Sequence, residues 1–250
     1  MNPSTYFRRA ALALLPATLL LAACSKSDTP APTPAVDQGR VLISHAAAAA
    51  NTQITAFAND QQLGQLNYGQ STGYSTVTAG NATIRINNGS AVVATQTVAV
   101  AKGQNYSIFA YSPTSSIGSG ALLAVPDDLT APAVGTAKIR LVYLGVGAAS
   151  PVRLSIPPAT PMGMPNDLTT DVAFAAASSF VVVNAGPLSL SVTTAAAPRT
   201  PVVAVGDGTG AGTGSKTFES GKIYTIVVRG ISGNGVPAAQ QLQAVIIPNN

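Results

Sequence analysis

The sequence has no tryptophan, one histidine and one cysteine in 250 residues, and only 9% of its residues are charged. One cysteine can neither close a disulfide within the chain nor form a multi-thiolate metal site. One histidine, His45, excludes metal centres and mechanisms that need two imidazoles. Beyond Arg8 and Arg9 there is no run of basic residues, so the chain lacks the electrostatic footprint of a nucleic-acid-binding protein. We expect no cofactor and no nucleic-acid partner.

The lone cysteine follows a segment with the features of a secretory signal. Arg8 and Arg9 precede an apolar run, residues 10–23, which Pro16 interrupts. A helix needs about 20 apolar residues to span a bilayer, so this run is too short. We therefore expect residues 1–23 to form a cleaved signal peptide.

The residues around the cysteine, Leu21, Ala22, Ala23 and Cys24, resemble the lipobox of bacterial lipoproteins. The resemblance implies that Cys24 becomes the first mature residue and carries lipid on its sulfur, because a thiol is nucleophilic enough to accept a diacylglycerol group. Two lipid signals would then hold the protein stably on a membrane. Ser25 in place of aspartate implies transfer to the outer membrane, at its cell-surface or periplasmic face. The alternative is a buried cysteine in an ordinary signal peptide.

The residues after the cysteine fall into a linker and two similar copies of one pattern. Residues 24–38 are rich in proline, serine and threonine and are expected to form a flexible linker. The matching segments are 40–46 with 138–144, 54–58 with 152–156, 77–86 with 183–192, 102–111 with 220–229, and 121–125 with 241–245. Their spacing grows because the second copy carries longer loops around PPATPMGMP and GDGTGAGTGSK. The repeat predicts two tandem domains, residues 39–130 and 131–250.

Apolar residues alternate with polar ones in both copies. Ile84 and Ile86 flank Arg85, and the same alternation runs through residues 188–192. Short alternating runs separated by turn residues are typical of antiparallel strands, and about six or seven strands in roughly 100 residues predict an immunoglobulin-like β-sandwich. The predicted fold class is all-β. Three aromatic pairs recur in both copies and are predicted core positions: Tyr68 with Phe174, Tyr74 with Phe180, and Tyr106 with Tyr224.

Five motifs of the first copy resemble the domain-of-unknown-function family numbered 4397, which occurs in secreted and lipid-anchored bacterial proteins, often in tandem. They are ISHA (43–46), NYGQSTGY (67–74), TAGNATIRI (78–86), KGQNYSI (102–108) and PDDL (126–129). The resemblance implies a fold and a location but no activity. The second copy has Tyr143 in place of the histidine and lacks the aspartate pair. The acidic loop usual after that histidine is replaced here by alanines.

Four residues are candidates for a functional surface: His45, Tyr111, Asp127 and Asp128. A weak hydrolase could use His45 with one of the aspartates, but no nucleophile motif accompanies them. Because Tyr143 takes the same place in the second copy, we expect His45 to be a strand-end residue that bonds a loop. Adjacent aspartates suit neither a hydrolase pair nor a complete calcium site, so we expect Asp127 and Asp128 to cap the turn into the following linker.

The remaining motifs favour binding over catalysis. The glycine-rich residues 206–217 lack the lysine placement and following helix of a phosphate loop and predict a mobile hairpin loop. Tyr111 is the aromatic side chain left to stack on a sugar. The sequence thus predicts a non-enzymatic, lipid-anchored cell-envelope protein. The alternatives are a surface adhesin that binds a glycan or a partner protein, and a weak hydrolase centred on His45.

Overall fold

The computed structural model describes residues 36–116, 118, 120–158, 160 and 163–250. The predicted signal peptide, the lipobox and most of the linker lie outside these residues. The described chain is built from β-strands, with one short 3-10 helix, η1 (Ala238–Gln240), so the predicted all-β class is confirmed. In this part of the chain no helix has the length and apolar character needed to cross a membrane.

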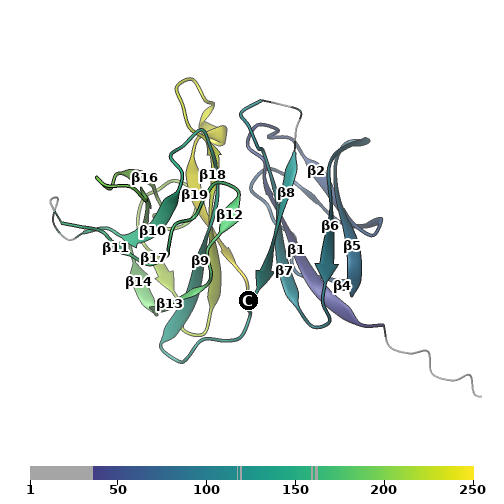
Figure 1. Cartoon of the computed structure of the whole chain (residues 1–250), viewed down its shortest axis with the longest axis horizontal. Helices are drawn as coiled ribbons and strands as arrows, with labels where there is room; N and C mark the ends of the chain where they lie inside the picture. The colour runs from purple at the N-terminus through teal and green to yellow at the C-terminus, as the bar shows by residue number, and fades with distance from the viewer. Residues whose placement is uncertain (1–35, 117, 119, 159, 161–162) are drawn as a thin grey trace, which may run out of the picture. The chain divides into compact units, whose positions relative to one another are not determined.

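The N-terminal half, residues 36–130, consists of two four-stranded sheets. Its strands are β1 (Gln38–Ala46), β2 (Ile54–Ala58), β3 (Gln61–Leu66), β4 (Ser75–Thr78), β5 (Gly80–Asn88), β6 (Ala91–Val100), β7 (Asn105–Tyr111) and β8 (Ala121–Asp127). The inner sheet has the order β4-β1-β7-β8, with β1 and β7 parallel (Figure 1). The outer sheet has the order β3-β2-β5-β6 and is antiparallel throughout.

The C-terminal half, residues 131–250, follows the same plan, with shorter strands mainly in its outer sheet. They are β9 (Thr136–Val146), β10 (Val152–Ile156), β11 (Asn166–Asp167), β12 (Ala176–Ala177), β13 (Val181–Asn184), β14 (Gly186–Leu188), β15 (Ser191–Thr194), β16 (Pro201–Ala204), β17 (Lys216–Phe218), β18 (Ile223–Ile231) and β19 (Gln243–Pro248). The inner sheet is β12-β9-β18-β19, with β13 also on β9, and the outer sheet is β11-β10-β15-β16. Strands β9 and β18 are parallel, like β1 and β7.

The ladder registers correct one of the sequence matches. Tyr106 lies opposite Pro126 on β8, and its counterpart Tyr224 lies opposite Pro248 on β19. Residues 121–125 therefore correspond to 243–247, two positions beyond the match made from the sequence. A slip of two residues leaves every side chain on the same face of a strand, so the apolar alternation could not detect it. The correct register makes Asn249 the counterpart of Asp127.

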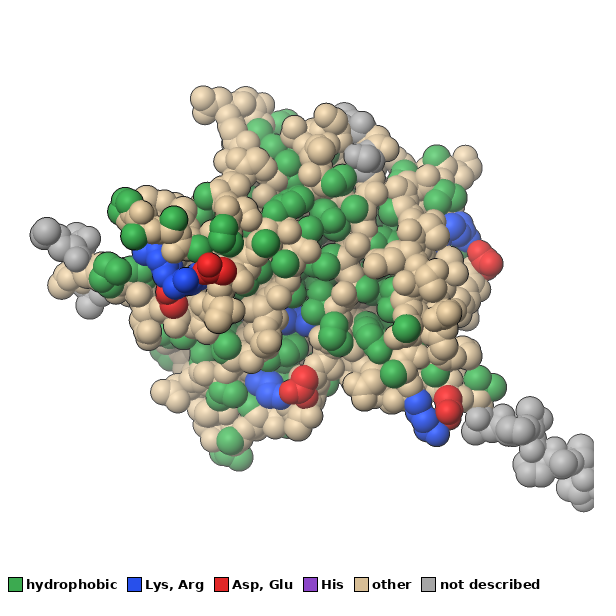
Figure 2. Space-filling view, in the orientation of Figure 1, with side chains coloured by type: hydrophobic (Ala, Val, Ile, Leu, Met, Phe, Trp, Pro, Cys, Tyr) green, Lys and Arg blue, Asp and Glu red, His purple; other side chains and the backbone are tan. Residues whose placement is uncertain are grey.

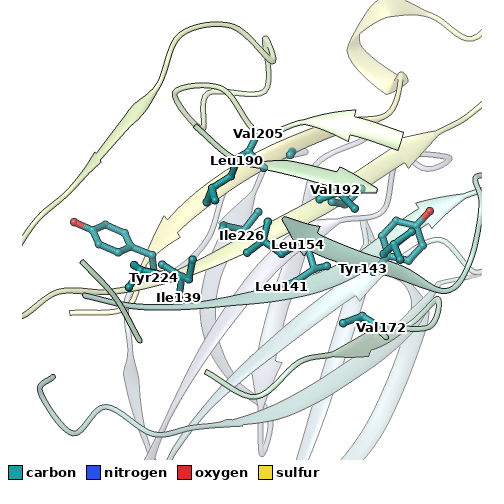
Figure 3. Close-up of a cluster of buried hydrophobic side chains, with 14 of the residues drawn as sticks. Ile139, Leu141, Tyr143, Leu154, Val172, Leu190, Val192, Val205, Tyr224 and Ile226 are labelled. Carbon is teal, nitrogen blue, oxygen red and sulfur yellow. The ribbon is translucent and has the colours of Figure 1, made fainter. Parts of the chain in front are cut away.

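Each half encloses its own core, and a third cluster lies between the two inner sheets. Ile139, Leu141, Leu154 and Ile226 belong to the core of the C-terminal half (Figure 3). The third cluster joins residues of both halves: Ala46, Phe109, Val142, Leu144 and Val227. The inner strands are therefore covered on both faces. This is why β1, β9 and β18 contain nearly continuous buried runs and not the alternation of a half-buried strand.

Candidate functional site

An apolar pocket of about 110 Å³ opens at one end of the N-terminal half, between its two sheets. It lies where β1 and β7 end and where β8 begins. Ile54, Ile86 and Val93 form part of the wall, and alanines and glycines form most of the rest. Among the described residues that line it there is no charged side chain. The pocket is suited to an uncharged apolar group, since a charge placed there would lose its hydration without gaining a partner.

His45 holds the loop that forms one side of this pocket. Its Nε2 donates to the carbonyl oxygen of Thr52 at 2.8 Å, and its Nδ1 accepts from the N–H of Ala47 at 3.3 Å. These roles require the neutral ring, and burial lowers the pKa of His45 from its ordinary value. The side chain is fully buried, so its expected place on the surface was wrong. The reason is that β1 is covered on both faces.

Tyr143 occupies the corresponding place in the C-terminal half. Its hydroxyl donates to the carbonyl oxygen of Ala149 at 2.7 Å, and burial raises its pKa to about 12. Both halves thus use a side chain at the end of their first strand to hold the loop that follows. With both ring nitrogens engaged and the ring buried, His45 is not placed to act on a substrate as the alternative of a weak hydrolase would require.

Asp127 is not a turn cap but a buried ion-pair partner. The residue is 3% exposed, and its Oδ2 accepts from the Tyr74 hydroxyl at 2.5 Å and from the Ser107 hydroxyl at 2.8 Å. Its other oxygen, Oδ1, accepts from the guanidinium of Arg140 on β9. The expectation of a surface position was wrong because the inner sheet of the C-terminal half covers this end of β8.

Arg140 is 1% exposed and joins the two halves. Besides its bond to Asp127, its Nε donates to the Thr225 hydroxyl at 2.9 Å, and its guanidinium lies 4.5 Å from the centre of the Phe180 ring. Burial lowers the pKa of Arg140, and the charge of Asp127 opposes that shift. A buried charge needs such partners to remain ionised.

Tyr74 and Asn249 extend the same network across the interface. The Asn249 amide donates to the Tyr74 hydroxyl at 3.0 Å. Burial of Tyr74, followed by the carboxylate of Asp127, raises its pKa to about 12. The network thus contains both Asp127 and Asn249, which occupy equivalent positions in the two halves.

Asp128 remains at the surface and does cap the turn. Its Oδ1 accepts from the N–H of Thr130 at 3.0 Å, and its Oδ2 accepts from Lys138 at 2.6 Å. These two hydrogen bonds, that from Lys138 first, lower the pKa of Asp128 to about 2. The aspartate pair therefore separates into one buried and one exposed carboxylate.

Two of the repeated aromatic residues, Tyr106 and Tyr224, pack in the cores of their halves, as predicted. Tyr68 and Tyr74 instead contact the other half. Tyr111 meets Phe174 edge to face at 5.9 Å, and it is half-buried. The guanidinium of Arg229 lies 4.6 Å from the centre of the Tyr68 ring. Tyr111 and Arg229 are counterparts by register, as are Tyr68 and Phe174, so the halves meet with approximate twofold symmetry. Recurrence in both copies could not distinguish an interface from a core.

The charged side chains on the face seen in Figure 2 form a few separate groups among apolar and neutral polar atoms. One network of ion pairs joins Arg153, Asp167, Asp171 and Arg199 in the C-terminal half. Within the described ranges, no group of three or more histidine, cysteine, aspartate or glutamate residues is arranged to hold a metal ion.

The fold and interface define an all-β protein, and comparison with known proteins adds a family match. Residues 39–150 match the family described as "Domain of unknown function (DUF4397)", in agreement with the resemblance of the first copy. The match covers the N-terminal half and continues through β9, the strand that supplies Arg140. No curated protein matches the chain.

Two solved structures illustrate the remote similarities. The tip fimbrial protein Mfa3 from Porphyromonas gingivalis, with a C-terminal truncation, is 10% identical, with 84% of this chain and 99% of that one covered and a TM-score of 0.27. A candidate cell adhesion protein from Bacteroides eggerthii is 12% identical, with 85% and 96% covered and a TM-score of 0.23. Similarity at these TM-scores does not assign a function to the chain.

Proposed function

We propose that this protein is a lipid-anchored, non-enzymatic binding module of the bacterial cell envelope, built from two immunoglobulin-like repeats. The observation that carries the binding role is the apolar pocket at the end of the N-terminal half. The anchoring role rests on the lipobox resemblance of Leu21, Ala22, Ala23 and Cys24.

The position of the pocket within the N-terminal half supports this role. The described chain enters at Val36, beside the start of β1, whereas the pocket lies beyond Ala46 at the end of that strand. Nine strand residues span about 30 Å. Val36 therefore lies at the end of the N-terminal half opposite the pocket.

A surface adhesin that binds a glycan or a partner protein is the second candidate. Residues 199–216 of the C-terminal half, which include β16 and the glycine-rich loop after it, offer a surface for such a partner. Shortening that segment should reduce retention of a partner if these loops bind it. The weak hydrolase receives no support from His45, because its ring is buried and hydrogen-bonded at both nitrogens.

The anchor is tested by expressing Cys24→Ala in the bacterium that makes the protein, with Ser25→Ala as the matched control. We expect the wild type and the control to incorporate an alkyne-labelled fatty acid and to partition into detergent. The Cys24→Ala chain should do neither, because it lacks the sulfur that accepts the diacylglycerol group. Mature Cys24→Ala protein that still partitions into detergent would contradict the lipoprotein proposal.

Protease treatment of intact cells, with a periplasmic protein as control, determines whether the protein faces the cell exterior or the periplasm. Digestion of this protein while the control survives would place the halves outside the cell and favour an adhesin. Protection of both would favour a role in the periplasm.

A further inference from the structure

The pocket of the N-terminal half has a filled counterpart in the C-terminal half. On the inner sheets, Tyr111 lies opposite Ala121, and its counterpart Arg229 lies opposite Gln243. The residues that precede Ala121 and Gln243 are therefore also counterparts, namely Gly120 and Leu242. Gly120 lines the pocket, whereas Leu242 packs against the core of its own half.

The Leu242 side chain occupies the position that corresponds to the pocket. A Cβ placed on Gly145 would lie 2.6 Å from Cδ1 of Leu242, so the leucine tip rests directly against that glycine. The counterpart of Gly145 is Ala47, which lines the pocket in the N-terminal half. The same space is therefore filled by a leucine side chain in one half and left open by glycine in the other.

The wall of the pocket has the chemistry of a leucine environment. Ile54, Ile86 and Val93 supply branched apolar surface, while Ala110 stands where the C-terminal half has the larger Val228. The volume, about 110 Å³, is of the same order as the roughly 150 Å³ apolar cavity that accepts benzene. A branched group of about four carbons fits this space.

We infer that the pocket binds a branched aliphatic group the size of a leucine side chain. This inference rests on the proposed binding function and names the class of its ligand. The group can belong to a peptide or to a free small molecule, and the chemistry that recognises it is the same. Residues 117 and 119 lie outside the described chain and are not assigned to the wall.

The inference is tested by titrating the complete mature chain with two probes and following backbone amide resonances by NMR. The first probe is the blocked peptide Ala-Ala-Leu-Ala-Ala, with blocked penta-alanine as its control, and the second is 3-methyl-1-butanol. We expect saturable shifts that map to residues 47–54, 86–94, 110–111, 118 and 120–121. A Kd at least tenfold lower for the leucine peptide than for the alcohol identifies a peptide side chain as the preferred source, and the reverse identifies a free small molecule.

Gly120→Leu should fill the pocket from within, as Leu242 does, and weaken binding of both probes at least tenfold. Gly73→Leu is the control for a leucine added outside the pocket: a Cβ on Gly73 has no neighbour within 4 Å, whereas a Cβ on Gly120 would lie 3.2 Å from the carbonyl oxygen of Val93. Ala110→Val, which introduces the residue found at the equivalent Val228, should weaken binding at least threefold. This smaller change tests the pocket independently if Gly120→Leu does not fold.

The inference is overturned if neither probe shifts these resonances, if penta-alanine binds as well as the leucine peptide, or if folded Gly120→Leu keeps wild-type affinity. If these results overturn the inference but Cys24→Ala loses the lipid, the proposed lipid anchor still stands. If the probes bind but Cys24→Ala still partitions into detergent, the ligand inference stands and the lipid anchor is disproved.

Discussion

At the scale of single residues, equivalent positions in the two halves perform the same task with different side chains. His45 and Tyr143 each end the first strand of their half and each bond a carbonyl oxygen of the next loop. The imidazole differs from the phenol in one respect, because it titrates near neutral pH and is held neutral by burial. This makes the N-terminal half sensitive to acid at His45.

The free energy of unfolding is expected to fall as the pH drops below 6.5, the ordinary pKa of histidine. The folded pKa of His45 is lower than this value, so the unfolded chain binds more protons there and acid favours unfolding. The contribution is fully present above 6.5 and is lost as the pH falls toward the folded pKa. His45→Gln keeps a donor for Thr52 without titrating. Urea unfolding at several pH values between about 5 and 8 should therefore give a smaller slope for His45→Gln, and equal slopes would disprove the prediction.

The sequence predicted part of this residue-scale chemistry. The shared position of His45 and Tyr143 predicted a hydrogen bond to a loop, and Asp128 caps the turn as expected. The burial of Asp127 was missed because its partner, Arg140, comes from a strand of the other half. Nothing in the local pattern around an aspartate indicates which distant strand will cover it.

At the scale of elements, the glycine-rich loop of the C-terminal half covers the edge of β19. Thr209 forms a bridge with Val245, and the N–H of Ile246 donates to the carbonyl oxygen of Gly208 at 2.9 Å. An uncovered edge strand exposes backbone groups that can pair with other chains. The sequence predicted a mobile hairpin loop, because glycine content reveals turns but not the strand that a loop packs against.

Gly208→Ala is expected to destabilise the protein more than Gly221→Ala. Both glycines have positive φ values, +84° and +80°, so each substitution costs about 1 to 2 kcal/mol in backbone strain. A Cβ on Gly208 would also lie 2.5 Å from Ile246, whereas a Cβ on Gly221 has no neighbour within 4 Å. The clash should add about 1 to 3 kcal/mol. The free energies of urea unfolding measure the difference, and equal losses would show that the loop does not pack on β19.

At the scale of the whole described chain, the two halves are joined by an interface with approximate twofold symmetry. Apolar residues such as Phe109 and Val227 form its centre, with the Asp127 and Arg140 pair to one side. The symmetry is broken at that pair. The counterpart of Asp127 is Asn249, and the counterpart of Arg140 is Leu42. One side of the symmetric interface therefore holds a buried ion pair, and the equivalent positions on the other side hold two neutral residues.

The counterparts Asn249 and Leu42 suggest the substitutions that test the ion pair: Asp127 is replaced by asparagine and Arg140 by leucine. Asp127→Asn leaves Arg140 buried without a counter-charge, and Arg140→Leu leaves Asp127 in the same situation. Each change should cost about 3 to 5 kcal/mol, whereas the double variant should recover most of that loss. Urea unfolding gives the coupling energy from the four proteins.

The exposed pair Lys102 and Asp37 provides the comparison, with side chains 74% and 55% exposed. Its coupling should stay below about 1 kcal/mol, because water screens the two charges.

If the interior pair joins the halves, Asp127→Asn should also split the single unfolding transition of the wild type into two, as each half begins to unfold separately. A single transition in Asp127→Asn, together with a coupling no larger than that of the exposed pair, would mean that the apolar contacts at Phe109 and Val227 hold the halves together without it.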